Sequence, residues 1–212
     1  MDTRKWTNQL DRNTEAFVQE FGNLSAEQLN WKPAAQTWSI AQNIDHLITT
    51  NATYFPIVKQ LQSGQYSVPW IGKFNWITNF FGNFILKGVS PDRRNKIKTF
   101  PIWEPTSSDH DADILEQFKT HQEELKKMIE SAQDLLNKGA VLSSPANQMI
   151  VYKLATAFDI IVTHEQRHLE QAKEVKALLK GNTVRFHRFA PRALTAEEHG
   201  QLPAIYPLNF KQ

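Results

Sequence analysis

Apolar side chains recur every three or four residues along four long stretches of this 212-residue chain. The stretches cover residues 3–21, 39–63, 109–137 and 145–180. This spacing is typical of a helix that is apolar on one face, and such a face is stable only when it is buried against another element. Long runs of alternating β-branched residues are absent. The sequence therefore predicts an all-α fold, a four-helix bundle.

Local signals place the ends of these helices. Ser39 is the expected N-cap of the second long helix, and the run from Ser25 to Gln28 is a capping box for a short helical turn. Pro56 lies inside the second helix, so we expect a kink or a break near Phe55. Gly181 and the asparagine after it are expected to end the fourth helix.

The connection between the second and third helices spans residues 65–108, which is too long for a tight turn. It fits a crossover along the bundle, with a short helix from about Phe74 to Leu86. The aromatic side chains of this crossover could line a pocket, fill the core or form a dimer contact. We expect one domain over residues 1–180, with residues 181–212 as an extended C-terminal tail packed on the same domain.

Composition narrows the chemistry and the location. The chain has no cysteine, so any metal must be held by His, Asp or Glu. A formal net charge of +2 is too balanced to predict nucleic-acid binding. The uncharged stretch from Phe74 to Leu86 is shorter than the roughly 20 residues that cross a bilayer. We expect it to be buried or to form an interface rather than to lie on a membrane. With no apolar leader at the N-terminus, the expected location is the cytoplasm.

Two histidines have the spacing of metal ligands. His164 and His168 are four residues apart on the predicted fourth helix, so their imidazoles lie one turn apart and can share one cation. His46 on the second helix could be an ordinary surface histidine, but a bundle could bring it to this pair. Three imidazoles would leave a coordination position free for water or substrate, which is typical of catalytic sites. His121 lies on the apolar face of the third helix, where we expect a core or cavity histidine.

Glu165 follows His164 directly and completes an H-E-x-x-H sequence. In zinc proteases the glutamate of this sequence is the general base. A protease would also need a third ligand downstream and a strand to hold the peptide, and the chain offers neither a matching motif nor an evident strand. Glu165 is therefore a candidate catalytic base or a buried carboxylate that orients the ligands.

Two motifs resemble the DinB-like superfamily, which includes the DinB/YfiT group of metal-dependent hydrolases and thiol transferases. They are Trp38-Ser-Ile-Ala-Gln-Asn-Ile-Asp-His46-Leu and, about 120 residues later, Thr163-His-Glu-Gln-Arg-His168. The resemblance covers roughly residues 3–180. It implies a four-helix bundle, a homodimer and a divalent metal, nickel or zinc, held by His46, His164 and His168.

The resemblance leaves the reaction open. It implies a hydrolase or a transferase that uses a low-molecular-weight thiol such as bacillithiol, mycothiol or glutathione, acting on a small-molecule substrate. The alternative is a metal-binding or small-molecule-binding helical dimer of a stress response, without catalysis. A third alternative is a helical dimer whose histidines bind no metal.

Overall fold

The structure is a computed structural model that describes residues 1–92, 99–105, 107, 109–111 and 113–189, with the backbone alone for 180–189. The chain divides into two units, residues 1–179 and 180–212. The first unit holds every side chain discussed below. Within the second, the described part is the end of the last helix, which runs to Phe189.

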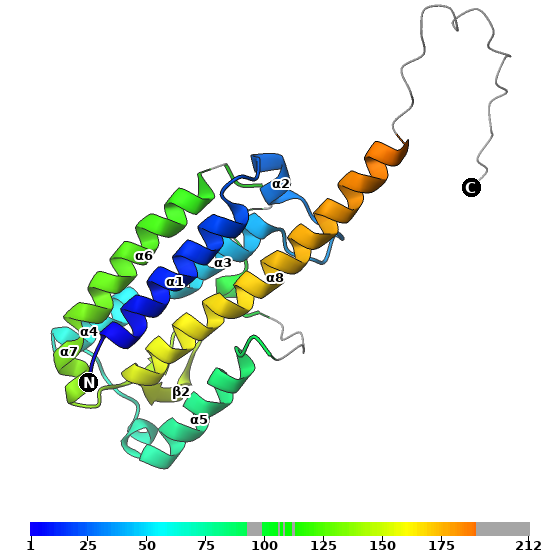
Figure 1. Ribbon diagram of the computed structural model, residues 1–212. Helices are drawn as coiled ribbons and strands as arrows, with labels where there is room; N and C mark the ends of the chain where they lie inside the picture. Colours follow the sequence, from blue (N-terminus) through cyan, green and yellow to red (C-terminus); the bar gives the residue numbers. More distant parts are fainter. Residues whose placement is uncertain (93–98, 106, 108, 112, 190–212) are drawn as a thin grey trace, which may run out of the picture. The chain divides into compact units, whose positions relative to one another are not determined.

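Four long helices lie side by side in the first unit (Figure 1). They are α1 (Arg4–Phe21), α3 (Ile40–Ala52), α6 (Ile114–Ser131) and the first part of α8 (Leu154–Phe189). The rings of Phe17 on α1 and Phe118 on α6 pack at 4.9 Å between centroids. The indole of Trp6 donates a hydrogen bond to Asp159 of α8 at 2.8 Å. The fold is mostly helical, as the apolar spacing predicts.

Shorter elements connect these helices. They are α2 (Ala26–Asn30), α4 (Tyr54–Gln62), α5 (Asn75–Gly88), α7 (Gln133–Asn137) and two 3-10 turns, η1 (Trp70–Lys73) and η2 (Pro101–Trp103). The expected capping boxes begin α2 and α3, where Ser25 and Ser39 each accept a hydrogen bond from the backbone three residues on. The short crossover helix expected over Phe74 to Leu86 is α5. Among the described residues, no helix is both long enough and apolar enough to cross a membrane.

The predicted break in the second stretch is confirmed. Helix α3 ends at Ala52 and α4 begins at Tyr54, with Thr53 between them. Pro56 has no N–H for the carbonyl of Ala52, and its ring would collide with that carbonyl in a continuous helix. Helix α3 therefore ends at Ala52, four residues before the proline, and a new helix begins.

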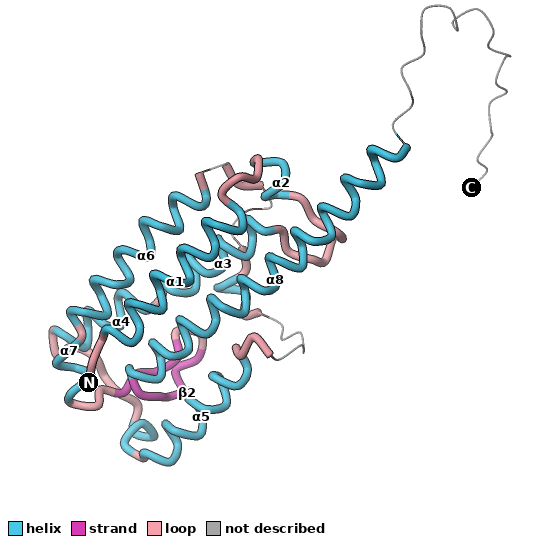
Figure 2. Tube along the Cα trace, viewed as in Figure 1, coloured by secondary structure: helices cyan, strands magenta, loops and turns pink. Residues whose placement is uncertain are grey.

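A small hairpin corrects the expectation of a purely helical chain (Figure 2). Strand β1 (Val141–Ser144) pairs with β2 (Asn147–Lys153) in an antiparallel two-stranded sheet. The fourth helix was expected from about Pro145 but begins at Leu154. The prediction was wrong because β-branched and aromatic residues flank the turn at Pro145, which favours a hairpin over a helical start.

Two other boundaries differ from the sequence prediction. Helix α6 begins at Ile114 rather than at Asp109. Helix α8 continues through Gly181 to Phe189, so this glycine does not end it. A single glycine costs a helix only about 1 kcal/mol relative to alanine, which makes it a weak stop signal. The expectation of an extended tail falls largely on residues 190–212, which lie outside the described residues.

The core consists of two apolar clusters. One lies around Trp6, Leu125 and Phe158, and the other around Phe17, Ile44 and Phe118. Along α1 and α8 the sequence passes from one cluster to the other across a buried polar residue, Asn13 and Glu165 respectively. A polar layer therefore separates the two halves of the core.

Candidate metal centre

Helices α3 and α8 bring three imidazoles together. His46 comes from α3, and His164 and His168 come from successive turns of α8. The Nε2 atom of His164 lies 3.4 Å from Nε2 of His46 and 3.0 Å from Nε2 of His168. The candidate ligand atoms of all three residues lie within 4.8 Å of one another. The histidine triad expected from the sequence is thus close in space.

The outer nitrogens of two of these rings are held by fixed acceptors. Nδ1 of His46 donates to the backbone carbonyl of Trp103 in η2, at 2.5 Å. Nδ1 of His168 donates to the Oδ1 of Asn43 at 2.8 Å, while the amide nitrogen of Asn43 donates to the carbonyl of Ser39. With their protons on Nδ1, neutral rings of His46 and His168 carry a lone pair on Nε2, toward the centre of the triad.

The surroundings keep these rings uncharged. Burial lowers the pKa of His46, and it lowers the pKa values of His164 and His168 well below their ordinary value. The neighbouring imidazoles lower the pKa values of His164 and His168 further, because two adjacent positive charges repel. Neutral imidazole is the form that binds a metal ion.

This geometry fits a divalent metal. Zn–N bonds are about 2.0–2.1 Å, so nitrogens that share a tetrahedral ion lie about 3.4 Å from one another. The Nε2 atom of His164 lies 3.0 and 3.4 Å from the other two Nε2 atoms, which is close to this value. Lone pairs that face one another at such distances repel unless a proton or a cation lies between them. The donor set is therefore suited to nickel or zinc, for both of which imidazole is a good ligand.

Trp38 packs against the triad. Its ring stacks on His168 at 5.9 Å with an interplanar angle of 21°, and it lies 4.8 Å from the ring of His46. The indole therefore shields one side of these two imidazoles from water. It also supports their orientation, because a displaced ring would collide with it.

Glu165 does not share the hydrogen-bond partners of the triad. Its carboxylate accepts hydrogen bonds from Asn13 of α1 and from Asn51 of α3, both at 2.9 Å. The side chain is fully buried, and burial raises the pKa of Glu165 to about 7, although the amide donors act in the opposite direction. These hydrogen bonds tie the carboxylate to α1 and α3 and thereby fix how α8 is rotated.

His121 lies apart from the triad, in the apolar part of α6. Its ring packs edge-on against Phe55 at 5.6 Å, and its Nε2 has no hydrogen-bond partner among the described residues. Burial lowers the pKa of His121 to about 4. The expectation of a core histidine is confirmed.

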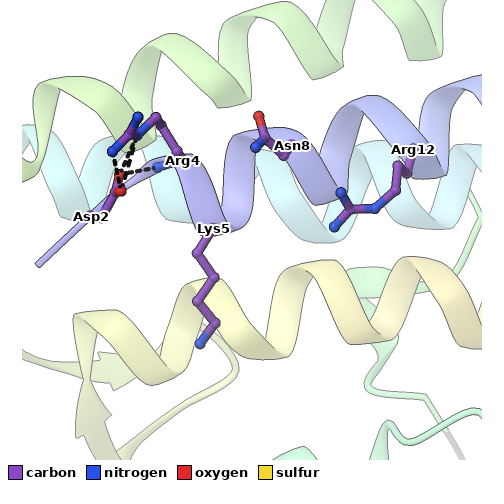
Figure 3. Close-up of a pocket in the computed structure, with 5 residues that line it drawn as sticks. All are labelled: Asp2, Arg4, Lys5, Asn8 and Arg12. Carbon is purple, nitrogen blue, oxygen red and sulfur yellow. Dashed lines mark hydrogen bonds and ion pairs between the residues drawn. The ribbon is translucent and has the colours of Figure 1, made fainter.

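A shallow surface hollow at the start of α1 is lined by charged and polar side chains instead of imidazoles (Figure 3). It is lined by Asp2, Arg4, Lys5, Asn8 and Arg12. Its cations already have partners, since Arg4 pairs with Asp2, Lys5 with Asp159 and Arg12 with Gln9. It contains none of the three imidazoles, so the triad is the stronger candidate site.

The sequence analysis missed the residues that orient the triad. Asn43 precedes His46 by three positions and so shares its helix face, which is a usable signal for a supporting residue. Asn13 interrupts the apolar face of α1 between Leu10 and Phe17, which also marks a buried polar contact. The carbonyl of Trp103 carried no signal, because any residue type offers the same acceptor.

Comparison with known proteins agrees with the resemblance that the two histidine-containing motifs indicate. The sequence model of the DinB superfamily matches residues 9–172. The chain belongs to the DinB superfamily. It is 31% identical over 160 residues to YuaE, an uncharacterized protein of Bacillus subtilis (strain 168), in an alignment that covers 74% of this chain and 88% of YuaE. No solved structure matches the chain significantly.

In this DinB-superfamily chain, Glu165→Leu should lower the free energy of unfolding by about 2 kcal/mol, because it leaves the buried amides of Asn13 and Asn51 short of an acceptor. Urea unfolding of the metal-free protein measures the change. Glu174→Leu, at an exposed position of the same helix, is the control and should change stability little. Equal stability of the two variants would contradict the anchoring role of Glu165.

His121 should lower the free energy of unfolding as the pH falls below about 6.5. Its pKa is about 4 when folded and about 6.5 when unfolded, so below pH 6.5 the unfolded chain takes up a proton that the folded protein excludes. The contribution is complete above pH 6.5 and is lost as the pH falls toward 4. His121→Met should remove up to about 1.4 kcal/mol per pH unit of this dependence. Urea unfolding of the wild type and of His121→Met at pH 7 and pH 5 tests this. The triad contributes equally to the pH dependence of both proteins, so the difference between them isolates His121. The same pH dependence in both proteins would refute the prediction.

Proposed function

We propose that this protein is a metal-dependent enzyme that holds one divalent ion, nickel or zinc, through His46, His164 and His168. The convergence of three imidazole Nε2 atoms supports this assignment most directly. The hydrogen bonds of His46 to Trp103 and of His168 to Asn43 support it independently. Such outer partners are typical of metal ligands, because they fix the tautomer and the ring orientation.

Three protein ligands favour a catalytic over a structural role, since structural zinc sites usually have four. When bound, a divalent metal would lower the pKa of a water or a thiol that coordinates it. This chemistry fits two reaction classes, hydrolysis and the transfer of a low-molecular-weight thiol to a small electrophile. For the transferase, the thiol has to come from a cofactor because the chain has no cysteine.

The chain's own residues have distinct tasks in this proposal. Asn43 and the carbonyl of Trp103 hold two of the imidazoles with Nε2 inward, and Trp38 excludes water from one side of them. Glu165 is a positioning residue, because its carboxylate accepts hydrogen bonds from the amides of Asn13 and Asn51. The role of catalytic base stays a prediction for Glu165.

We also propose that α1, α3, α6 and α8 form the four-helix bundle that the resemblance implies. Hydrogen bonds along α8 to both α1 and α3, together with the packing of α1 and α3 on α6, support this arrangement. The homodimer and the cytoplasmic location stay predictions.

His164→Ala should abolish stoichiometric metal binding, because it removes the nitrogen that lies closest to both other ligands. The measurement is elemental analysis of the purified protein, followed by titration of the metal-free protein with Zn²⁺ and Ni²⁺. His121→Met is the matched control, since it removes a buried histidine outside the triad. Equal metal content in wild type and His164→Ala would overturn the assignment.

Catalysis is tested on the metal-loaded protein. Turnover of a chromogenic ester, or of a thiol with a chromogenic electrophile, should occur in the wild type and in His121→Met but not in His164→Ala. Stoichiometric metal without turnover of either substrate class would favour the non-catalytic metal-binding alternative.

Asn43→Ala should weaken metal binding about tenfold or more, because His168 loses the acceptor that fixes its tautomer. Asn43→Asp keeps an acceptor for His168 while it loses the same hydrogen bond to the Ser39 carbonyl, so it should bind metal more tightly than Asn43→Ala. Competition with a chelator of known affinity measures both. Similar affinities of the two variants would show that the bond to His168 is not what matters.

A further inference from the structure

Helix α5 exposes its largest apolar side chains. Trp76, Phe80 and Phe84 form one ridge, spaced four residues apart, and are 71%, 61% and 66% exposed. The buried residues of α5 are Thr78 and Gly82, which are small. A surface helix of a soluble protein normally has the opposite arrangement, with large apolar side chains turned to the core.

The inward face of α5 is already closely packed, so this orientation is fixed by the fold. A Cβ on Gly82 would lie 2.8 Å from Cγ2 of Thr156 and 3.4 Å from Cβ of Tyr152. At its C-terminal end the helix is held by Arg167, which donates to the carbonyl oxygens of Gly88 and Ser90. The inward face therefore has no room for the three large aromatic rings.

Two further aromatic residues are exposed just before the helix. Trp70 of η1 and Phe74, next to the start of α5, are also exposed, and their rings pack edge-on at 5.9 Å. We call Trp70, Phe74, Trp76, Phe80 and Phe84 the aromatic face. Together they expose roughly 600 Å² of aromatic side chain, an amount comparable with the largest apolar patches of soluble monomers. Of the three roles that the sequence left open for the crossover aromatics, burial in the core does not apply to these five residues.

The charged residues of the segments that carry and flank the aromatic face are all lysines. The chain has 22 Asp and Glu residues, but none lies in residues 65–91 or 139–158, which form η1, α5, β1 and β2. The same segments contain Lys73, Lys87 and Lys153. Lys73 and Lys87 are exposed, and neither forms a salt bridge within the described part of the chain.

We infer that the aromatic face docks on an anionic lipid surface as a peripheral contact. Tryptophan and phenylalanine on one helix face insert at the boundary between headgroups and acyl chains, and the lysines add attraction to anionic headgroups. A second copy of this chain is a poorer occupant. A symmetric contact would place the same lysine-flanked surface against itself, and residues 65–91 and 139–158 contain no carboxylate to offset the charge.

Vesicle co-sedimentation of the full chain tests this docking. The wild type should sediment with vesicles of phosphatidylglycerol and phosphatidylcholine, and less with phosphatidylcholine alone. Trp76→Ser with Phe80→Ser should reduce binding about tenfold or more, because two inserting rings are lost. Lys73→Glu with Lys87→Glu should reduce binding to anionic vesicles, and added salt should weaken the wild type.

Leu178→Ser is the control, since Leu178 is an exposed apolar residue of α8 away from the aromatic face, and it should bind like the wild type. Circular dichroism checks that each variant keeps its helices. The proposal is overturned if the wild type does not sediment, if Leu178→Ser loses binding equally, or if neutral vesicles bind as well as anionic ones. It is also overturned if light scattering shows a dimer that Trp76→Ser with Phe80→Ser separates while vesicle binding is unchanged.

Discussion

The buried carboxylate of Glu165 is the contact on which the rest of the centre depends. It receives the amides of Asn13 and Asn51 from two other helices, in a layer that divides the apolar core. A buried carboxylate is costly unless its oxygens are satisfied, so these three helices have one favourable alignment. Apolar packing alone would allow α8 to turn or slide with a smaller loss of free energy.

This alignment determines where the histidines point. Successive residues of a helix are about 100° apart, so when Glu165 faces Asn13 and Asn51, His164 and His168 are turned toward α3. There they meet His46, and Asn43 accepts the outer proton of His168. The polar layer and the triad are thus two consequences of one helix orientation. Residues remote from any metal should for this reason affect the affinity of the centre.

Where the polar layer places polar groups inside the core, α5, packed on the hairpin, places apolar groups on the surface. Their contact is made by small residues such as Gly82, which lets the helix approach Tyr152 closely and turns its aromatic rings outward. Arg167 lies between His164 and His168 in the sequence and donates to the end of α5. The helix that carries two triad histidines is therefore also attached to the helix that carries most of the aromatic face.

By itself, the sequence determined the local features of this protein. Apolar spacing predicted the long helices, and the spacing of His164 and His168 predicted a pair of imidazoles on one helix face. Pro56 predicted a kink or a break near Phe55, and the structure has the break after Ala52. These features depend on backbone geometry within a few residues, which the chain encodes directly. The hairpin at Pro145 was missed although its signal is local, because short apolar runs are compatible with either a strand or a helix.

Only the tertiary structure decided the features that depend on distant segments. His46 has the pattern of a surface residue, and it is buried because η2, more than fifty residues later, brings the Trp103 carbonyl to its ring. Trp76, Phe80 and Phe84 of α5 are as apolar as core residues, and they are exposed because Thr78 and Gly82 take the inward face. Burial is a property of what packs against a residue, and the residue's own neighbours in the sequence do not specify it.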